Sequence, residues 1–255
     1  MEGRALLLAL SVMKNGDWNA IFEAVKSKEN IDNRYVESVL NIGYEFTTLL
    51  DSEYPDNLKH TVRPPFVIFY EGNIGLMSAE TKKICVANDN LSSSYSQESI
   101  NKISKELADK RILVLPFNNK RNAELIKKVV DVGGKVIAVM DRGIGKENSC
   151  DKELYEELVA HHLVLSVFPR TVYKRTINTE ISSSALLVGV SDSLLVGGIS
   201  RKTPASSTLA FALEQGKNVY SIPFPIGSNY MNNSLIREGA ILVESGSQII
   251  EEEGE

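Results

Sequence analysis

Three neighbouring hydroxyl residues stand where a helix is expected to begin: Ser206, Ser207 and Thr208. Thr203 followed by Pro204 is a typical helix start, and apolar residues then recur at helical spacing until Gly216 ends the pattern. A helix N-terminus presents unpaired backbone N–H groups and the positive end of its dipole. The pattern therefore predicts a phosphate site at this turn.

Two basic residues, Arg201 and Lys202, come immediately before this turn and favour an anion there. A predicted strand at 193–197 precedes them and another, at 218–223, follows the helix, so the turn is expected at the carboxyl end of a parallel strand. Open α/β sheets bind their ligands at that end. The alternative is that Thr203 only caps the helix and the serines contact solvent.

Further basic side chains are expected at the same edge of the sheet, because they too follow predicted strands. They are Lys120 and Arg121, Arg142, and Arg170 with Lys174 and Arg175. If these loops converge, the side chains form a groove that follows a phosphate backbone, and Tyr173 offers a ring on which a base stacks. The competing interpretation is a set of solvated charges on surface loops.

Strands and helices alternate along most of the chain. Short apolar runs predict strands at 66–70, 82–87, 111–115, 135–140, 163–169, 193–197, 218–223 and 240–243. Helices are predicted near 96–109, 122–132, 151–160, 178–187, 204–215 and 233–238. This alternation is typical of an α/β protein and predicts a Rossmann-like, doubly wound and mainly parallel sheet.

The first part of the chain differs, since residues 3–50 have the pattern of short helices joined by polar turns. Trp18 is expected to anchor the core of this helical appendage. The sequence therefore predicts a small helical N-terminal domain, 1–46, followed by a Rossmann-like domain, 47–255.

The composition is that of an ordinary globular protein, with 43% hydrophobic and 24% charged residues in 255. The 28 Lys and Arg against 33 Asp and Glu give a formal charge of −5, which argues against a broadly basic coat but allows a local basic groove. Cys85 and Cys150 show neither zinc spacing nor a disulfide framework, which indicates a reducing cytoplasm. The apolar stretch at 5–10 is too short for a membrane span, so no membrane association is expected.

Candidates for catalysis are few. His60 lies in an extended linker, and His161 and His162 close a predicted helix, where a cation is an ordinary capping choice. The chain contains no Gly-x-Ser-x-Gly elbow, no Walker loop and no zinc-type spacing of Cys and His. These patterns favour binding over catalysis, with no cofactor and no metal expected.

A series of short motifs resembles a known family. The lead-in to the first apolar strand carries Tyr54, Pro55, Leu58, Pro64, Pro65 and Gly72. Later landmarks follow at 133–139, 166–169, 186–197, 212–223 and 233–240. In this order the motifs are similar to those of the DNA-processing protein A (DprA/Smf) family, and together they cover most of residues 47 to 245.

The resemblance implies a cytoplasmic, non-enzymatic protein that binds single-stranded DNA. Members of this family protect incoming DNA during natural transformation, act in DNA recombination and help to load the RecA recombinase. Because they form dimers, a homodimer is implied here, with RecA as a further partner. The DNA and phosphate contacts predicted on these grounds are Lys120, Arg121, Arg170, Tyr173, Lys174, Arg175, Arg201, Lys202, Ser206, Ser207 and Thr208.

The chain differs from the family pattern at several places, of which the turn after the first Rossmann strand is one. Where the family has Gly-Ser/Thr-Arg after its first Rossmann strand, this chain has Ala87, Asn88 and Asp89. An aspartate repels the phosphate that an arginine would bind. The difference favours an alternative function, a Rossmann-fold nucleotide-binding sensor or nucleotide hydrolase that has lost DNA binding. A protein-interaction scaffold is a third alternative.

Overall fold

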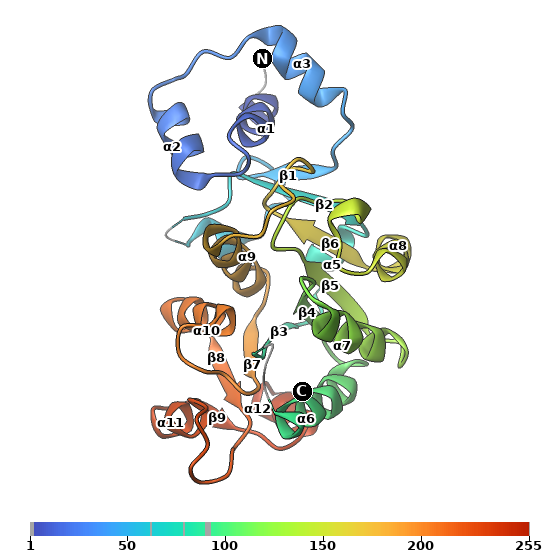
Figure 1. The fold of residues 1–255 in the computed structure, drawn as a ribbon, viewed down its shortest axis with the longest axis vertical. Coiled ribbons are helices and arrows are strands. Elements are labelled where there is room, and N and C mark those ends of the chain that lie inside the picture. The colour runs from blue at the N-terminus through green and yellow to red at the C-terminus, as the bar shows by residue number, and fades with distance from the viewer. Residues whose placement is uncertain (1–2, 62, 79, 90–92, 255) are drawn as a thin grey trace.

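The computed structural model describes residues 3–61, 63–78, 80–89 and 93–254. Within these ranges, nine strands form one sheet in the order β1-β2-β6-β5-β4-β3-β7-β8-β9 (Figure 1). Their bounds are β1 (Phe46–Thr48), β2 (Val67–Gly72), β3 (Lys83–Ala87), β4 (Ile112–Pro116), β5 (Lys135–Val139), β6 (Leu163–Ser166), β7 (Ser193–Val196), β8 (Asn218–Ser221) and β9 (Ile241–Leu242).

The strands from β6 to β9 in this order are all parallel, and β1 and β2 are antiparallel additions at the other edge. The strand order turns back at β3, where Ile84 pairs with Leu113 of β4 on one side and with Ser193 of β7 on the other. Such a turning point is the usual ligand site of an open α/β sheet. The doubly wound, mainly parallel α/β fold is thereby confirmed.

Helices cover both faces of the sheet. Their bounds are α1 (Gly3–Met13), α2 (Trp18–Lys26), α3 (Asn33–Leu40), α4 (Asp56–Lys59), α5 (Gly75–Ser78), α6 (Ser94–Leu107), α7 (Lys120–Val130), α8 (Lys152–His161), α9 (Ile177–Gly189), α10 (Pro204–Glu214), α11 (Asn232–Arg237) and α12 (Gly246–Glu252), with a 3-10 turn η1 (Lys146–Asn148). One face carries α6, α7, α8 and α12, and the other carries α9, α10 and α11. The strands and helices predicted from residue 82 onward are present, with ends that differ by a few residues.

The two layers follow from the alternation of side chains along each strand. In β5, Val136 and Ala138 are buried under one helical layer, whereas Ile137 and Val139 are buried under the other. Strands covered on both faces must be apolar throughout, which explains the continuous apolar runs in the sequence. The sheet therefore forms the centre of the core, and the loops lie at the two ends of its strands.

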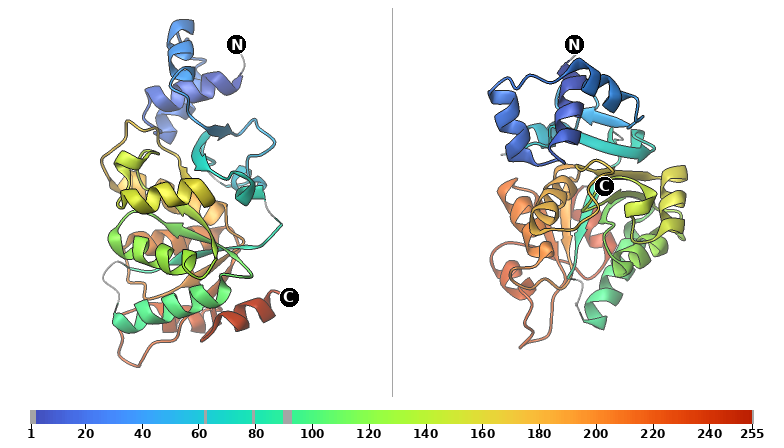
Figure 2. Two further views of the ribbon diagram at one scale, coloured as in Figure 1. Left: turned by 90° about the vertical axis from the view of Figure 1, so that its right-hand side faces the viewer. Right: turned by 45° about the horizontal axis from the view of Figure 1, so that its top comes forward.

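The helices α1, α2 and α3 stand at one end of the molecule, ahead of the first strand (Figure 2). They share a small core that includes Leu10, Ile21 and Val36. Leu8 of α1 and Val39 of α3 instead pack into the main core. The boundary between the domains at 1–46 and 47–255 stays a prediction.

Trp18 joins these helices to the linker before β2. Its ring stacks on Phe22 with 5.0 Å between the ring centroids, and its centroid lies 5.5 Å from that of Phe66. Its Nε1 donates a hydrogen bond of 2.8 Å to the carbonyl oxygen of Pro64. Because Trp18 is only half-buried, it anchors a junction rather than the centre of the helical core.

The sequence pattern extended the helical region to residue 50, but the last N-terminal helix, α3, ends at Leu40. β1 pairs antiparallel with β2, with Phe46 opposite Phe69 and Thr48 opposite Val67. Phenylalanine and threonine favour strands, and the buried β2 offers them a partner. Helix over residues 46–48 is therefore a wrong prediction.

Candidate functional site

The loops that follow neighbouring parallel strands meet at one edge of the sheet. β6, β5, β4, β3 and β7 are adjacent and run in the same direction. Lys120 and Arg121 begin α7 after β4, residues 170–175 follow β6, and residues 201–208 follow β7. The topology brings these three groups to the side of the sheet where the parallel strands have their carboxyl ends, here called the carboxyl edge. β3 lies between the third group and the other two.

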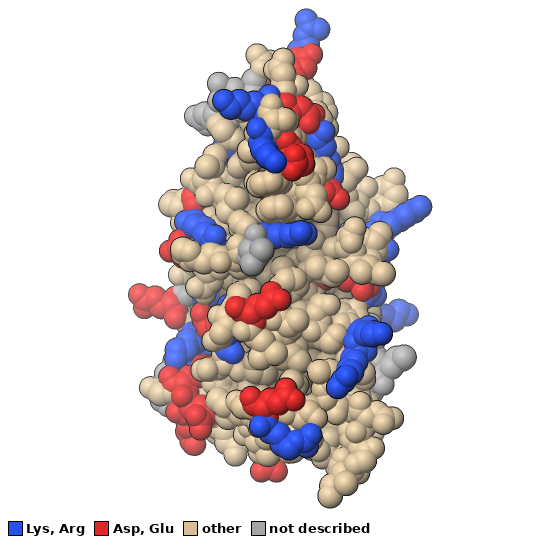
Figure 3. All heavy atoms as spheres, turned by 90° about the vertical axis from the view of Figure 1, so that its left-hand side faces the viewer, with Lys and Arg blue, Asp and Glu red and all other residues tan. Residues whose placement is uncertain are grey.

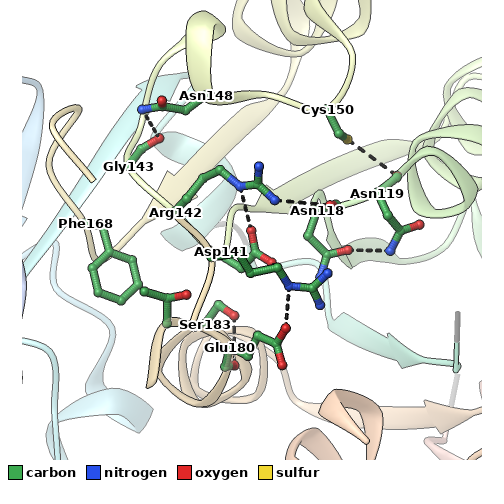
Figure 4. Close-up of polar contacts among 12 residues, drawn as sticks. Asn118, Asn119, Asp141, Arg142, Gly143, Asn148, Cys150, Phe168, Glu180 and Ser183 are labelled. Carbon is green, nitrogen blue, oxygen red and sulfur yellow. Dashed lines mark hydrogen bonds and ion pairs between the residues drawn. The ribbon is translucent and has the colours of Figure 1, made fainter. Parts of the chain in front are cut away.

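Asp141 is the centre of the polar contacts at this edge (Figure 4). It follows β5, and only 1% of its side chain is exposed. Its Oδ1 accepts a hydrogen bond of 3.0 Å from Nε of Arg142, and its Oδ2 lies 2.9 Å from Nε of Arg175. Arg175 also pairs with Glu180 in the first turn of α9. One buried carboxylate therefore holds two guanidinium groups.

Asn118 connects this cluster to the loop after β4. A terminal nitrogen of Arg142 donates to the carbonyl oxygen of Asn118 at 3.5 Å. The side-chain oxygen of Asn118 accepts hydrogen bonds of 2.7 Å from the amides of Asn119 and Asn122. The loops after β4, β5 and β6 thus form one polar surface.

The loops after β5 and β6 approach each other too closely for a side chain at Gly143. A Cβ atom there would lie 2.1 Å from the carbonyl oxygen of Pro169. The Gly143 N–H donates to the carbonyl oxygen of Val172 at 2.6 Å. Asn148 donates to the carbonyl oxygens of Gly143 and Arg170 at 3.0 and 2.9 Å. The backbone of both basic loops is therefore held in place.

Carboxylates already balance three of the arginines at this edge. Arg142 and Arg175 are paired with Asp141, and Arg170 places a terminal nitrogen 3.0 Å from Glu71. A guanidinium group carries five N–H donors, so contact through Nε leaves the terminal nitrogens for a second acceptor. The arginines are positioned for hydrogen bonding, but they add little net charge.

The lysines and the tyrosine among the predicted residues are accessible. Lys120, Lys174 and Lys202 are exposed, and none of them pairs with an acid within the described ranges. Tyr173 is 68% exposed. Arg201 is exposed as well. These side chains supply the uncompensated positive charge and the free ring at the carboxyl edge.

The helix α10 begins as predicted, with Thr203 as its N-cap. The hydroxyl groups of Ser206 and Thr208 form hydrogen bonds at the start of the helix itself. Ser206 Oγ donates to the Thr203 carbonyl oxygen at 2.7 Å and accepts from the Thr203 N–H at 3.0 Å. Thr208 is buried and donates to the Pro204 carbonyl oxygen, and Ser207 is half-buried. Phosphate binding by these three hydroxyls stays a prediction.

Sequence reasoning did not identify Asp141 and Glu180 as parts of the site. Asp141 follows an apolar strand directly, which is a usable signal, because side chains just past a parallel strand reach the ligand-binding edge. Glu180 carries no such signal, since an acid in the first turn of a helix is an ordinary choice.

A large cleft, of about 1470 Å³, lies elsewhere and was not predicted. It runs between the N-terminal helices and α9 and α10, with Trp18, Phe66 and Asn178 among its lining residues. Its walls come from segments far apart in the sequence, so no local pattern indicates it.

On the side of the molecule shown in Figure 3, basic and acidic residues are interspersed rather than separated by sign.

The thiols and His162 are held neutral by burial. Burial raises the pKa of Cys150 to about 11 and that of Cys85 to about 12, so neither is a thiolate nucleophile at neutral pH. Burial, with a smaller contribution from the nearby charge of Lys135, lowers the pKa of His162 to about 4. His162 is therefore not the capping cation expected from the sequence, and its Nδ1 accepts from the Val136 N–H at 3.4 Å.

Residues 3–61, 63–78, 80–89 and 93–254 contain no group of three or more His, Cys, Asp or Glu placed to hold a metal ion. In the same part of the chain, no helix has the length and apolar character needed to cross a membrane.

Comparison with known proteins gives consistent matches. DNA processing protein DprA of Streptococcus pneumoniae is 26% identical over 208 residues, which are 80% of this chain and 73% of that protein. DprA of Bacillus subtilis is 25% identical over 221 residues, 82% of this chain and 71% of that protein. Protein Smf of Escherichia coli is 28% identical over 79% of this chain, which spans 54% of Smf.

Solved structures match the fold. DprA of S. pneumoniae aligns with a TM-score of 0.76 at 22% identity, over 98% of this chain and 93% of that chain. DprA of Helicobacter pylori aligns with a TM-score of 0.67 at 16% identity, over 82% and 95%. The model of the family described as DNA recombination-mediator protein A matches residues 45–254. This chain therefore belongs to the DNA recombination-mediator protein A family, which confirms the resemblance to DprA and Smf.

Proposed function

We propose that this protein binds single-stranded DNA along the carboxyl edge of its sheet and acts in DNA uptake, natural transformation and recombination. Membership of the family supports this proposal. The solved structure of the H. pylori relative concerns the binding of single-stranded DNA by that protein. The proposed contacts are the exposed Lys120, Tyr173, Lys174, Arg201 and Lys202, together with Arg121, Arg170, Arg175 and the hydroxyls of Ser206, Ser207 and Thr208.

The observation that carries the proposal is the arrangement around Asp141. This buried carboxylate pairs with Arg142 and Arg175 in the loops that follow two adjacent parallel strands, where side chains reach a ligand. Fixed guanidinium groups recognise phosphate through paired N–H donors. Exposed lysines beside them attract the backbone, and the Tyr173 ring offers a stacking surface that tolerates any base.

The role proposed is binding rather than catalysis, in the cytoplasm and as a homodimer that helps to load RecA on DNA. Thiols that stay protonated at neutral pH and a neutral, buried His162 support a role without chemistry. Protected single-stranded DNA is the substrate that a recombinase needs, which links the proposed binding to recombination.

Replacement of three exposed lysines tests the proposed surface. The variant Lys120→Gln, Lys174→Gln, Lys202→Gln is expected to bind a fluorescent oligothymidylate more weakly than the unaltered protein. If each lysine contacts one phosphate, the slope of log K against log salt falls in magnitude by about 2, because each contact contributes about 0.7 on single strands. Fluorescence anisotropy over a salt series measures both quantities.

A matched variant carries the same change of charge at the opposite edge. Lys105, Lys110 and Lys135 are exposed and lie near the amino ends of β4 and β5. Their replacement by glutamine is expected to leave the salt slope nearly unchanged. Equal losses in the two variants would mean that only overall charge matters, and the carboxyl-edge site would be rejected.

A further inference from the structure

The crevice between the ends of β3 and β7, where the strand order turns back, is filled by the protein's own side chains. Three successive backbone N–H groups line it, those of residues 198–200. Each donates to a different acceptor: Gly198 to Ser96 Oγ at 2.6 Å, Ile199 to Asn232 Oδ1 at 3.3 Å, and Ser200 to Asp89 Oδ2 at 2.7 Å. Runs of backbone N–H groups are common anion sites, and here all three are occupied.

The surroundings of the crevice favour a negative charge. α6 begins after β3 and α10 begins after β7, so both helices start at this edge, next to the crevice. The N-terminus of each helix carries a partial positive charge. Together with the Ser200 N–H, the one backbone donor that Asp89 occupies, these helix ends are the kind of groups that bind phosphate in many α/β proteins.

Asp89 supplies the negative charge from within the chain. Only 7% of the residue is exposed, and its backbone N–H donates to the Gly198 carbonyl oxygen at 3.0 Å. Its second carboxylate oxygen, Oδ1, is buried and has no hydrogen-bond partner among the described residues. The carboxylate is therefore incompletely compensated, and it repels any further anion that approaches.

We propose that Asp89 closes this crevice to phosphate groups and so determines where a nucleic-acid backbone lies on the carboxyl edge. The consequence for DNA rests on the function proposed above. A strand then follows the loops after β4, β5 and β6 and passes near Lys202, without placing a phosphate on the Ser200 N–H that Asp89 occupies. Replacing Asp89 opens a second phosphate site.

Inorganic phosphate tests the closure without DNA. Thermal unfolding is measured in phosphate and in chloride at equal ionic strength, for the full chain and for Asp89→Ser and Asp89→Asn. Serine removes the charge and leaves space, whereas asparagine removes only the charge and still accepts from Ser200. A ligand that binds the native state raises Tm, and a rise of about 2–4 °C is expected in phosphate for Asp89→Ser. A smaller rise is expected for Asp89→Asn and none for the unaltered protein.

The outcomes separate cleanly. Asp109→Asn, an exposed carboxylate at the opposite edge, controls for the change in net charge and is expected to behave like the unaltered protein. The inference is overturned if phosphate shifts Tm equally in all variants, or in none. If Asp89→Ser does not fold, Asp89→Asn decides by whether its shift exceeds that of Asp109→Asn.

Binding of oligothymidylate tests independently whether Asp89 keeps DNA phosphates away from the crevice. Asp89→Asn is expected to bind about fivefold more tightly than Asp109→Asn at low salt, the effect of removing one like charge close to a phosphate. Unchanged affinity would contradict the consequence for DNA. If no variant binds DNA at all, the proposed function fails, while the phosphate series still decides whether Asp89 closes the crevice.

Discussion

At the scale of single residues, His162 makes stability depend on pH. Its pKa is about 4 in the folded protein, mainly because of burial, against an ordinary value of 6.5. Between these values the unfolded chain binds a proton that the folded chain does not, so the free energy of unfolding falls as pH falls from 6.5 to 4. Above 6.5 the imidazole is neutral in both states and has no effect.

The variant His162→Asn is expected to lose this part of the pH dependence, since its side-chain oxygen still accepts from Val136 and does not titrate. Urea unfolding at several pH values measures the difference between the variant and the unaltered protein. That difference should change between pH 6.5 and 4 and stay constant above 7. His161→Asn, at an exposed neighbour, serves as the control. Parallel pH profiles for all three proteins would contradict the assignment.

The sequence predicted Arg175 as a site residue but did not predict its pairing with Asp141. Arg175 was predicted as a site residue because it follows an apolar strand. Its pairing with Asp141 and Glu180 was not predictable, because the three residues lie in a loop, at a strand end and in a helix. Local sequence indicates which edge a side chain reaches, whereas its partner depends on how separate loops meet.

At the scale of elements, α12 is fastened to the sheet by a buried ion pair. Arg111, just before β4, places a terminal nitrogen 3.0 Å from Glu253, and the two side chains are 1% and 6% exposed. Tyr220 donates to the same carboxylate at 3.3 Å, and Lys82 Nζ donates to the Glu253 carbonyl oxygen at 2.8 Å. Glu253 thus contacts β8 and the residues that immediately precede β3 and β4.

Removal of that carboxylate should be costly. Glu253→Ala is expected to lower the free energy of unfolding by about 3 kcal/mol, because it removes the carboxylate that lies 3.0 Å from the buried Arg111 guanidinium group. The double variant Arg111→Met, Glu253→Leu should recover most of the loss, since apolar pairs often replace buried ion pairs at little cost. Denaturant unfolding measures both, with the exposed Glu252→Ala as control. A loss no larger than that of Glu252→Ala would refute the role of the pair.

The sequence predicted the elements that are specified by residues close to one another in the chain. The unit β7, α10 and β8 combines apolar strands buried on both faces with Thr203 and Pro204 at the helix start. β1 was not predicted because it depends on pairing with β2, whereas α12 was missed although Ser245 and Gln248 form a capping box at its start. The carboxyl edge followed from strand order, but the occupied crevice at Asp89 and the large cleft required the structure.

At the scale of the whole molecule, charge does not mark the binding face. The chain carries a formal charge of −5, and the arginines at the carboxyl edge are largely paired with acids. Long-range attraction of DNA is therefore weak, and the proposed binding relies on close contacts with a few exposed lysines and on fixed guanidinium groups. Such contacts suit a flexible single strand, which adapts its backbone to the loops.

The most direct test is a titration of the unaltered protein with fluorescent oligothymidylate across a salt series, with a duplex of equal length as control. The account predicts binding that prefers the single strand and weakens steeply as salt rises, because each phosphate contact releases counterions. Equal affinity for the duplex, or no binding at the lowest salt, would contradict single-stranded DNA binding and direct attention to nucleotides as the ligands of this Rossmann-like fold.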